Sequence, residues 1–512
     1  MDKLPAEVLQ HIVSFIPRWT VGPVIRHSVL PALATVSRRF QSAIERCTFE
    51  HLRIIVTDEQ IRALQQTMNP ERILHLRGLT ITLMDPARQA KATTTRRFET
   101  DQDRQAEREI LTTPLRQLWN LLRTWDKNDS KSFYLELSAT NSHPTPDEHF
   151  SSPMWTTRVY AFSMLDLAED MENFPALPFI TRFQLSSFSR YWNPRVAMVL
   201  ASKMPNLEKL EWGLDEAEFG WGRYYSIDKQ YRDNLVHSTK TMGLPQSLRS
   251  FACTLKRPGY NRQFDNEDHS LPRFIERGSP DPMSLAMRDL TRNCTDIRLS
   301  GSFLPALFHP LSSIPGAEEQ PCWQHAKRLN IMIFPCSPDG SWLMRQRLQP
   351  TIEVDVPEHL LDCTQLPPGY ADTEEGCQQA QTFYNDHLER VIRTTDEYYA
   401  PPLFPDDENM NAMMVAFARC CARMPALEYA IVDFDYYQPS GYQMICVAAH
   451  HRLPDFKVDK EGPLDRCRIY LHFNDWRPED ATINEFEQVG VKKDGKPSSI
   501  FFVNDKHHTM WY

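Results

Sequence analysis

The sequence lacks the long apolar segments of membrane and secreted proteins. It contains no uninterrupted apolar run of about 18 residues, so we expect no membrane-spanning helix and no membrane partner. The N-terminal stretch MDKLPAEVLQHI also lacks the apolar core of a secretory signal. We therefore expect the protein in the cytoplasm, the nucleus or both. Glycine is scarce, with 17 residues against 38 prolines, which predicts stiff and extended loops.

Paired-cysteine motifs are also missing. The 11 cysteines are scattered and none forms a C-x-x-C motif, as expected for reduced thiols. Cys420 and Cys421 are adjacent on a predicted helix and point about 100° apart, which is poor geometry for binding one metal ion. We therefore predict core packing for these cysteines, no metal site and no cofactor.

The charge excludes a dedicated nucleic-acid-binding protein. The formal net charge is -10 and the pI is about 6.0. Binding to phosphates requires a basic stripe, and none is visible in the sequence. We expect no nucleic-acid partner.

Motifs of catalysis are absent as well. The sequence has no phosphate-binding loop, no nucleophile elbow and no HExxH helix. Asp433 and Asp435 would lie on one face of a strand, where acid-base chemistry could use them, although a strand-end turn is the simpler interpretation. We predict a non-catalytic protein, with an enzyme built from dispersed residues as the least favoured alternative.

What the sequence does contain, near its N-terminus, is a pair of short amphipathic helices. Leu4-Pro5 opens the first, with proline where the backbone N–H would be unpaired in any case, and Pro31 opens the second. Apolar residues recur at helical spacing in the first (Val8, Leu9, Ile12, Val13, Ile16) and in the second (Leu33, Val36, Phe40, Ile44). A unit of about 45 residues buries too little surface to be stable alone, so these faces predict a docking module.

The same residues carry a resemblance to a known family. The pattern Leu4-Pro5-x-Glu7-Val8-Leu9-x-x-Ile12, followed by Ala34-Thr35-Val36-Ser37-Arg38-Arg39-Phe40, resembles the F-box, most closely that of fungal F-box proteins. The F-box docks substrate receptors onto the Skp adaptor of cullin-based ubiquitin ligases. The resemblance implies an adaptor-binding set of Leu4, Pro5, Val8, Leu9, Ile12, Val36, Phe40 and Ile44. The sequence departs from the family between Ile16 and Leu33, where it is longer than usual and contains Gly22-Pro23.

A six-residue frame, apolar-x-x-apolar-x-apolar, recurs through the rest of the chain and predicts strands. Clear copies span Leu76–Ile81, Ile180–Leu185, Leu207–Trp212, Leu248–Cys253, Cys294–Leu299, Ala326–Ile331 and Leu427–Val432, with weaker ones near Phe133–Leu135 and Ile469–Leu471. Similar helical stretches precede three of them: VAMVLASKMPNLEKLEW, LAMRDLTRNCTDIRL and VAFARCCARMPALEYAIV. Stacked helix–strand units of this kind resemble irregular leucine-rich repeats, while another βα architecture stays open.

The predicted fold class is therefore α/β, with a helical F-box followed by an irregular helix–strand solenoid. We assign residues 1–52 to the F-box and 53–512 to the solenoid, with long insertions at 85–108, 138–155, 213–243 and 358–408. One further helix is predicted over 108–125 by the spacing of Leu111, Leu115, Leu118, Leu122 and Trp125.

Two aromatic clusters are candidate binding surfaces, because tyrosine and tryptophan supply large contact areas at low entropic cost. The first contains Trp212, Phe219, Trp221, Tyr224, Tyr225 and Tyr231. The second spans Tyr398 to Pro405, with Tyr436, Tyr437 and Tyr442 further on. The candidate substrate-binding residues are Trp221, Tyr224, Tyr225, Tyr398 and Tyr399, and loops folded back over the core are the alternative.

These observations predict the substrate-receptor subunit of a Skp–cullin–F-box type ubiquitin ligase. Its partners would be a Skp-type adaptor, a cullin reached through that adaptor, and an unidentified target protein. The alternative is an interaction scaffold whose F-box-like segment never meets a cullin complex.

Overall fold

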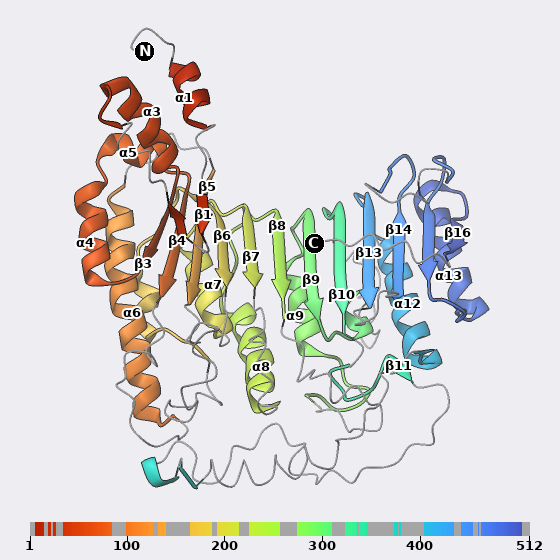
Figure 1. The fold of residues 1–512 in the computed structure, drawn as a ribbon. Helices are drawn as coiled ribbons and strands as arrows, with labels where there is room; N and C mark the ends of the chain where they lie inside the picture. Colours follow the sequence, from red (N-terminus) through yellow and green to blue (C-terminus); the bar gives the residue numbers. More distant parts are fainter. Residues whose placement is uncertain are drawn as a thin grey trace.

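The computed structural model describes residues 6–14, 19–21, 24–26, 34–83, 99–125, 132–139, 164–186, 192–213, 225–255, 274–309, 323–334, 337–345, 373–376, 378–379, 404–434, 442–453, 459 and 462–503. They form a mixed α/β structure around one long sheet, with a small helical module at its N-terminal end (Figure 1).

The sheet has 12 strands, and each pairs with the next one along the chain. The strands are β3 (His51–Ile55), β4 (Gly78–Leu83), β5 (Phe133–Ala139), β6 (Ile180–Ser186), β7 (Lys209–Gly213), β8 (Ser250–Thr254), β9 (Asp296–Gly301), β10 (Arg328–Ile333), β13 (Tyr429–Phe434), β14 (Tyr442–Val447), β15 (Arg468–His472) and β16 (Ser499–Phe502). All neighbours are parallel except β14, which is antiparallel to both β13 and β15. Two-stranded ribbons join β1 (Trp19–Val21) to β2 (Val24–Arg26) and β11 (Met344–Arg345) to β12 (Phe404–Pro405).

All nine strand frames found in the sequence are strands of this sheet, which confirms those predictions. The sequence analysis missed β3, β14 and β16.

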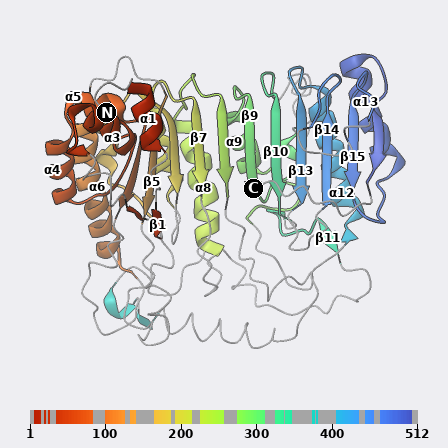
Figure 2. The same ribbon diagram turned by 45° about the horizontal axis from the view of Figure 1, so that its top comes forward.

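Helices line one side of the sheet, as the two orientations in Figures 1 and 2 show. They are α4 (Asp58–Thr67), α5 (Pro70–His75), α6 (Asp101–Arg123), α7 (Pro194–Ser202), α8 (Tyr225–Thr241), α9 (Pro282–Leu290), α12 (Asp407–Ala422) and α13 (Asp480–Asp494), with 3₁₀ turns η3 (Glu169–Asn173) and η5 (Pro305–Leu307). The small module contains α1 (Ala6–Ser14) and α3 (Arg38–Thr48).

Local signals explain where these helices begin. Asn193 and Asp281 cap α7 and α9, and each is followed by a proline at the first helical position. Thr100 and Asp103 form a reciprocal capping box at the start of α6. The helix predicted over 108–125 is confirmed, but it begins at Asp101 and so occupies the end of the insertion predicted at 85–108. Likewise, α8 occupies much of the insertion predicted at 213–243.

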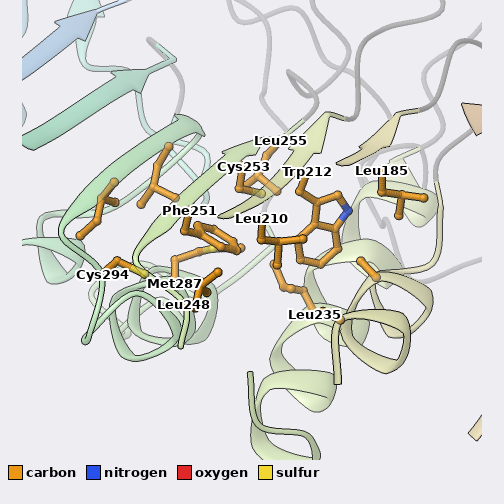
Figure 3. Packing of buried hydrophobic residues seen from close by; sticks show 14 of the residues in the cluster. Leu185, Leu210, Trp212, Leu235, Leu248, Phe251, Cys253, Leu255, Met287 and Cys294 are labelled. Carbon is orange, nitrogen blue, oxygen red and sulfur yellow. The ribbon is translucent and has the colours of Figure 1, made fainter. Parts of the chain in front are cut away.

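The core lies between the sheet and the helices. Leu210 and Trp212 of β7 and Phe251 of β8 are buried on the helical side, in the same cluster as Leu235 of α8 and Met287 of α9 (Figure 3). Alternate residues of each strand point to the opposite side. The sheet therefore has one apolar, helix-covered face and one open face.

A repeated backbone pattern links each unit to the next. The carbonyl oxygen of Glu208, just before β7, accepts hydrogen bonds from the N–H groups of Arg249 (2.8 Å) and Ser250 (3.0 Å) in the following unit. The carbonyls of Glu50, Arg249, Thr295 and Lys327 each accept two such bonds in the same way. This pattern keeps the strands in register along the row.

Candidate functional site

The first candidate surface belongs to helix α1. Val8 and Ile12 lie one turn apart and are each 41% exposed, whereas Leu9 and Val13 are buried at 1% and 4%. Residues four apart share a helix face, so α1 has one buried and one exposed apolar face. An exposed apolar face on so short a helix is a feature of a docking surface.

Helix α3 supplies the other side of this small core. Phe40, Ala43 and Ile44 are buried against Leu9 and Val13 in a cluster separate from that of the main sheet. Ser37 caps α3 by accepting a hydrogen bond from the Phe40 N–H (3.3 Å). The second helix was predicted to start at Pro31, which lies outside the described residues. Ala34 is helical, and the extended backbone of Ser37 separates it from α3, so the predicted helix is interrupted there.

The predicted adaptor-binding residues divide into three groups. Leu4 and Pro5 lie outside the described residues. Val8, Ile12 and Val36 are exposed, Val36 at 57%. Leu9, Phe40 and Ile44 point into the core of the module, so their side chains support the surface from inside.

A cation joins this module to the main sheet. Arg72 of α5 donates a hydrogen bond to the carboxylate of Glu45 in α3 at 2.7 Å, and its guanidinium lies 4.7 Å from the centre of the Phe49 ring. The hydrogen bond from Arg72 lowers the pKa of Glu45 below its ordinary value. Arg72 also donates to the carbonyl of Thr67 (2.8 Å), which ties the contact to the end of α4. The module is therefore anchored to α4 and α5, the first helices beside the main sheet.

The second candidate surface is the open face of the sheet. Its side chains are mostly polar and form hydrogen bonds between neighbouring strands. The Thr80 hydroxyl donates to the Glu136 carboxylate (3.0 Å), and the Tyr134 hydroxyl donates to the Gln184 side-chain carbonyl (2.6 Å). Sequence reasoning did not predict this surface, because the partners are about 50 residues apart in the chain. The only available signal was the set of polar positions inside each strand frame.

The open face changes from polar to apolar at the C-terminal end of the sheet. There, Ile431, Ile445, Val447 and Tyr470 form an apolar cluster with Leu453, which comes from the connection between β14 and β15. Leu453 therefore covers these strands on the side opposite the helices.

A buried ion pair holds that connection in place. Asp459 accepts hydrogen bonds from Arg468 Nε (2.7 Å), the Tyr470 hydroxyl (2.7 Å) and the Leu453 N–H (2.8 Å). Arg468 also donates to the carbonyls of Pro463 (2.7 Å) and His451. Burial alone would raise the pKa of Asp459, but these hydrogen bonds outweigh it and lower the pKa below its ordinary value.

The predicted substrate-binding residues are not brought together among the residues the structure describes. Trp221, Tyr224, Tyr398 and Tyr399 lie outside those residues, and only the backbone of Tyr225 is described, at the start of α8. Other members of the two aromatic clusters are buried: Trp212 and Tyr231 lie in the main core, and Tyr442 stacks on Phe473.

The described residues contain no group of three or more His, Cys, Asp or Glu side chains placed to hold a metal ion. Cys420 and Cys421 are buried in the core, as predicted. Asp433 accepts a hydrogen bond from Gln443 on the neighbouring strand, whereas Asp435 is outside the described residues. In the part of the chain that the structure describes, no helix is both long and apolar enough to cross a membrane.

A hollow of about 410 Å³ lies beside the turns that precede β8, β9 and β10. It is lined by Gln246, Arg249, Asn293, Thr295 and His325. Arg249 donates to the carbonyl of Gln246 (2.9 Å), so its charge is partly engaged by the turn itself. The lining offers polar contacts without a nucleophile paired to a base.

Comparison with known proteins adds one identification. Residues 1–52 match the model of the F-box domain family, and these residues contain α1, α3 and the start of β3. No curated protein matches the chain.

Proposed function

We propose that this chain, whose N-terminal residues form an F-box domain, is the substrate-receptor subunit of a Skp–cullin–F-box type ubiquitin ligase. F-box domains bind Skp-type adaptors, so the domain at residues 1–52 supports an adaptor partner. A cullin would be reached through that adaptor, and a target protein would bind elsewhere on the chain, in the cytoplasm or the nucleus.

The observation that carries the proposal is the exposure of Val8, Ile12 and Val36 on the matched domain. Apolar side chains on a small module are best satisfied by a partner that removes them from water. Leu4 and Pro5 belong to the same proposed interface, while Leu9, Phe40 and Ile44 shape it from the core, as their burial supports.

The remainder of the chain is proposed to be a leucine-rich-repeat-like solenoid that presents the target. Two features favour this assignment: each strand pairs only with its neighbours in the chain, and the same backbone hydrogen bonds recur from unit to unit. Trp221, Tyr224, Tyr225, Tyr398 and Tyr399 remain proposed target contacts.

Such a receptor would act by proximity and would need no catalytic residues of its own. Holding a target near a ubiquitin-loaded enzyme converts a bimolecular encounter into an effectively intramolecular one. The F-box would set one end of that geometry, and its contact with Arg72 would fix the direction of the sheet relative to the adaptor.

Co-purification with a Skp adaptor tests the proposal. The variant Val8→Asp/Ile12→Asp places charges on the exposed face of α1 and should weaken adaptor binding about 100-fold or more, because buried charges at an interface centre are costly. The control Ile110→Asp/Leu464→Asp changes two residues of similar exposure outside the F-box and should bind normally. A second variant, Leu4→Ala/Pro5→Ala, tests the residues before α1.

If wild type and both variants all fail to capture the adaptor, the chain is an interaction scaffold and the ligase assignment is wrong. If the α1 variant binds as tightly as wild type, the assigned surface is wrong.

A further inference from the structure

The open face of the sheet has an unusual distribution of charge over β6 to β10. The strand register places Arg182, Lys209, Ser250, Asp296 and Arg328 at one level on five successive strands. Arg298 lies one residue pair further along β9, on the same face. With strands about 4.8 Å apart, this row is about 19 Å long.

Basic groups outnumber acidic ones in this row. Glu211 is paired with Lys209 on its own strand, and Asp296 is shared by Arg328 (2.9 Å) and Arg298 (3.6 Å). Arg182 brings these five groups to six, with four positive and two negative charges, on a chain whose net charge is -10.

The arginines also keep donors free for a partner. The side chain of Arg298 is 68% exposed and that of Arg328 is 50% exposed, although both contact Asp296. A guanidinium has five N–H donors, and one carboxylate uses only some of them.

A strip of small side chains runs beside these basic groups. Four residues further along β6 to β9, the register places Ser186, Gly213, Thr254 and Ser300 side by side. An extended backbone could therefore lie across the strands on this strip, with the arginines along one side of it. Toward the C-terminus the polar face ends where Leu453 covers the strands.

We propose that the open face over β6 to β10 binds an extended, carboxylate-rich segment of a partner protein. This proposal rests on the proposed function and names the chemical class of the target. Positive charges spread over about 19 Å match several single carboxylates along about six extended residues better than one compact dianion. Glu211 and Asp296 stand within the row and would repel the continuous phosphate chain of a nucleic acid.

Fluorescence anisotropy with the full-length protein tests this directly. The probe is a labelled decapeptide of five Glu-Ser repeats, compared with a Lys-Ser decapeptide and a single-stranded oligonucleotide of ten nucleotides. We expect the Glu-Ser probe to bind, and to bind more weakly as salt is raised.

Two charge-removing variants and one control assign the surface. Arg298→Ser/Arg328→Ser and, separately, Arg182→Ser/Lys209→Ser should each weaken Glu-Ser binding about tenfold. The control Arg62→Ser/Lys240→Ser removes the same charge from exposed positions of α4 and α8 and should leave binding unchanged. Thermal melting confirms that each variant is folded.

Tighter binding of the oligonucleotide or the Lys-Ser probe, no binding of the Glu-Ser probe, or equal affinity in all variants would each overturn the proposal. Adaptor capture, measured on the same proteins, separates the two hypotheses. Peptide binding that depends on the arginines without adaptor capture would reject only the ligase assignment, whereas adaptor capture without peptide binding would reject only the acidic target.

Discussion

Arg72 is the residue that connects the F-box to the sheet. It contacts the Glu45 carboxylate and the Phe49 ring on the F-box side, and it donates a hydrogen bond to the carbonyl of Thr67 at the end of α4. The two cores are separate clusters. The orientation of the module relative to the sheet therefore depends on such side-chain contacts and on the direct chain connection into β3.

We predict that Arg72→Ala weakens the attachment of the F-box to the sheet. The ion pair is partly exposed, so the expected loss is about 1 kcal/mol of local stability. Amide hydrogen exchange should show faster opening of α3, with little change in the main sheet. Arg77→Ala is a nearby arginine control, and equal exchange of α3 in wild type and Arg72→Ala would refute this attachment.

At the residue scale, the sequence predicted which side chains are apolar in the F-box but not which way they point. Val8 and Leu9 are adjacent and similar in chemistry, and only the position of α3 decides that Leu9 is buried. The four-residue spacing of Val8 and Ile12, against that of Leu9 and Val13, was the available signal.

At the scale of elements, the connection between β14 and β15 depends on one buried ion pair. Asp459 and Arg468 are both almost fully buried, and Gly462 packs so closely on Arg468 and Tyr470 that an added Cβ would lie 2.8 Å from Arg468. Removing one member leaves the other charge buried and unpaired.

We predict that Asp459→Asn costs about 3–5 kcal/mol at neutral pH. The pKa of Asp459 is lower in the folded protein than its ordinary value of 3.8, so the folded state favours the carboxylate. This contribution is complete above the unfolded pKa and is lost as the pH falls through the folded pKa. Urea denaturation at several pH values should show a gap between wild type and variant that is widest near pH 7 and narrows in acid.

Asp465→Asn is the control for that experiment, because its carboxylate contacts Arg466 and Lys496 at the surface. A gap for Asp459→Asn that stays constant down to acid pH would contradict the role assigned to its charge.

Sequence patterns found the strands that are covered on one face and missed most of the others. The frame apolar-x-x-apolar-x-apolar reports alternation between a buried and an open side. β14 is buried on both faces by helices and by the connection after it, so its sequence is a nearly continuous apolar run. β3 and β16 are the edge strands, where the pattern is weak.

At the scale of the whole molecule, the order of the sheet determines how stability is distributed. In the part of the sheet that the structure describes, each strand is hydrogen-bonded only to the strands before and after it, so folding energy accumulates from neighbour to neighbour. Phe251 of β8 is fully buried near the middle of the row.

We predict that Phe251→Ala costs about 3–5 kcal/mol and divides unfolding into separate steps on either side of β8. Hydrogen exchange should show protection lost in β8 and β9 while β4 and β5 keep theirs. Phe502→Ala, at the exposed edge, should cost about 1 kcal/mol or less. A single uniform loss of protection across all strands would contradict this prediction.

The arginine-rich row could not be predicted from sequence for a related reason. Its members come from separate strands, and only the register brings Arg182, Lys209 and Arg328 to one level. In the sequence, each of these residues is a single charge within a segment of mixed polar and apolar residues.

The strand order also makes the length of the sheet proportional to the number of its strands. Because every strand adds about 4.8 Å in the same direction, the distance from the F-box to any point on the open face is counted in units. Gain or loss of a single helix–strand unit would shift every residue beyond it by about 4.8 Å along the sheet. The side chains at both ends of the sheet would stay the same. In this architecture, the distance from the F-box to a site on the open face can therefore change independently of the residues that form the site. Duplication of a unit changes the distance, and substitution changes the residues.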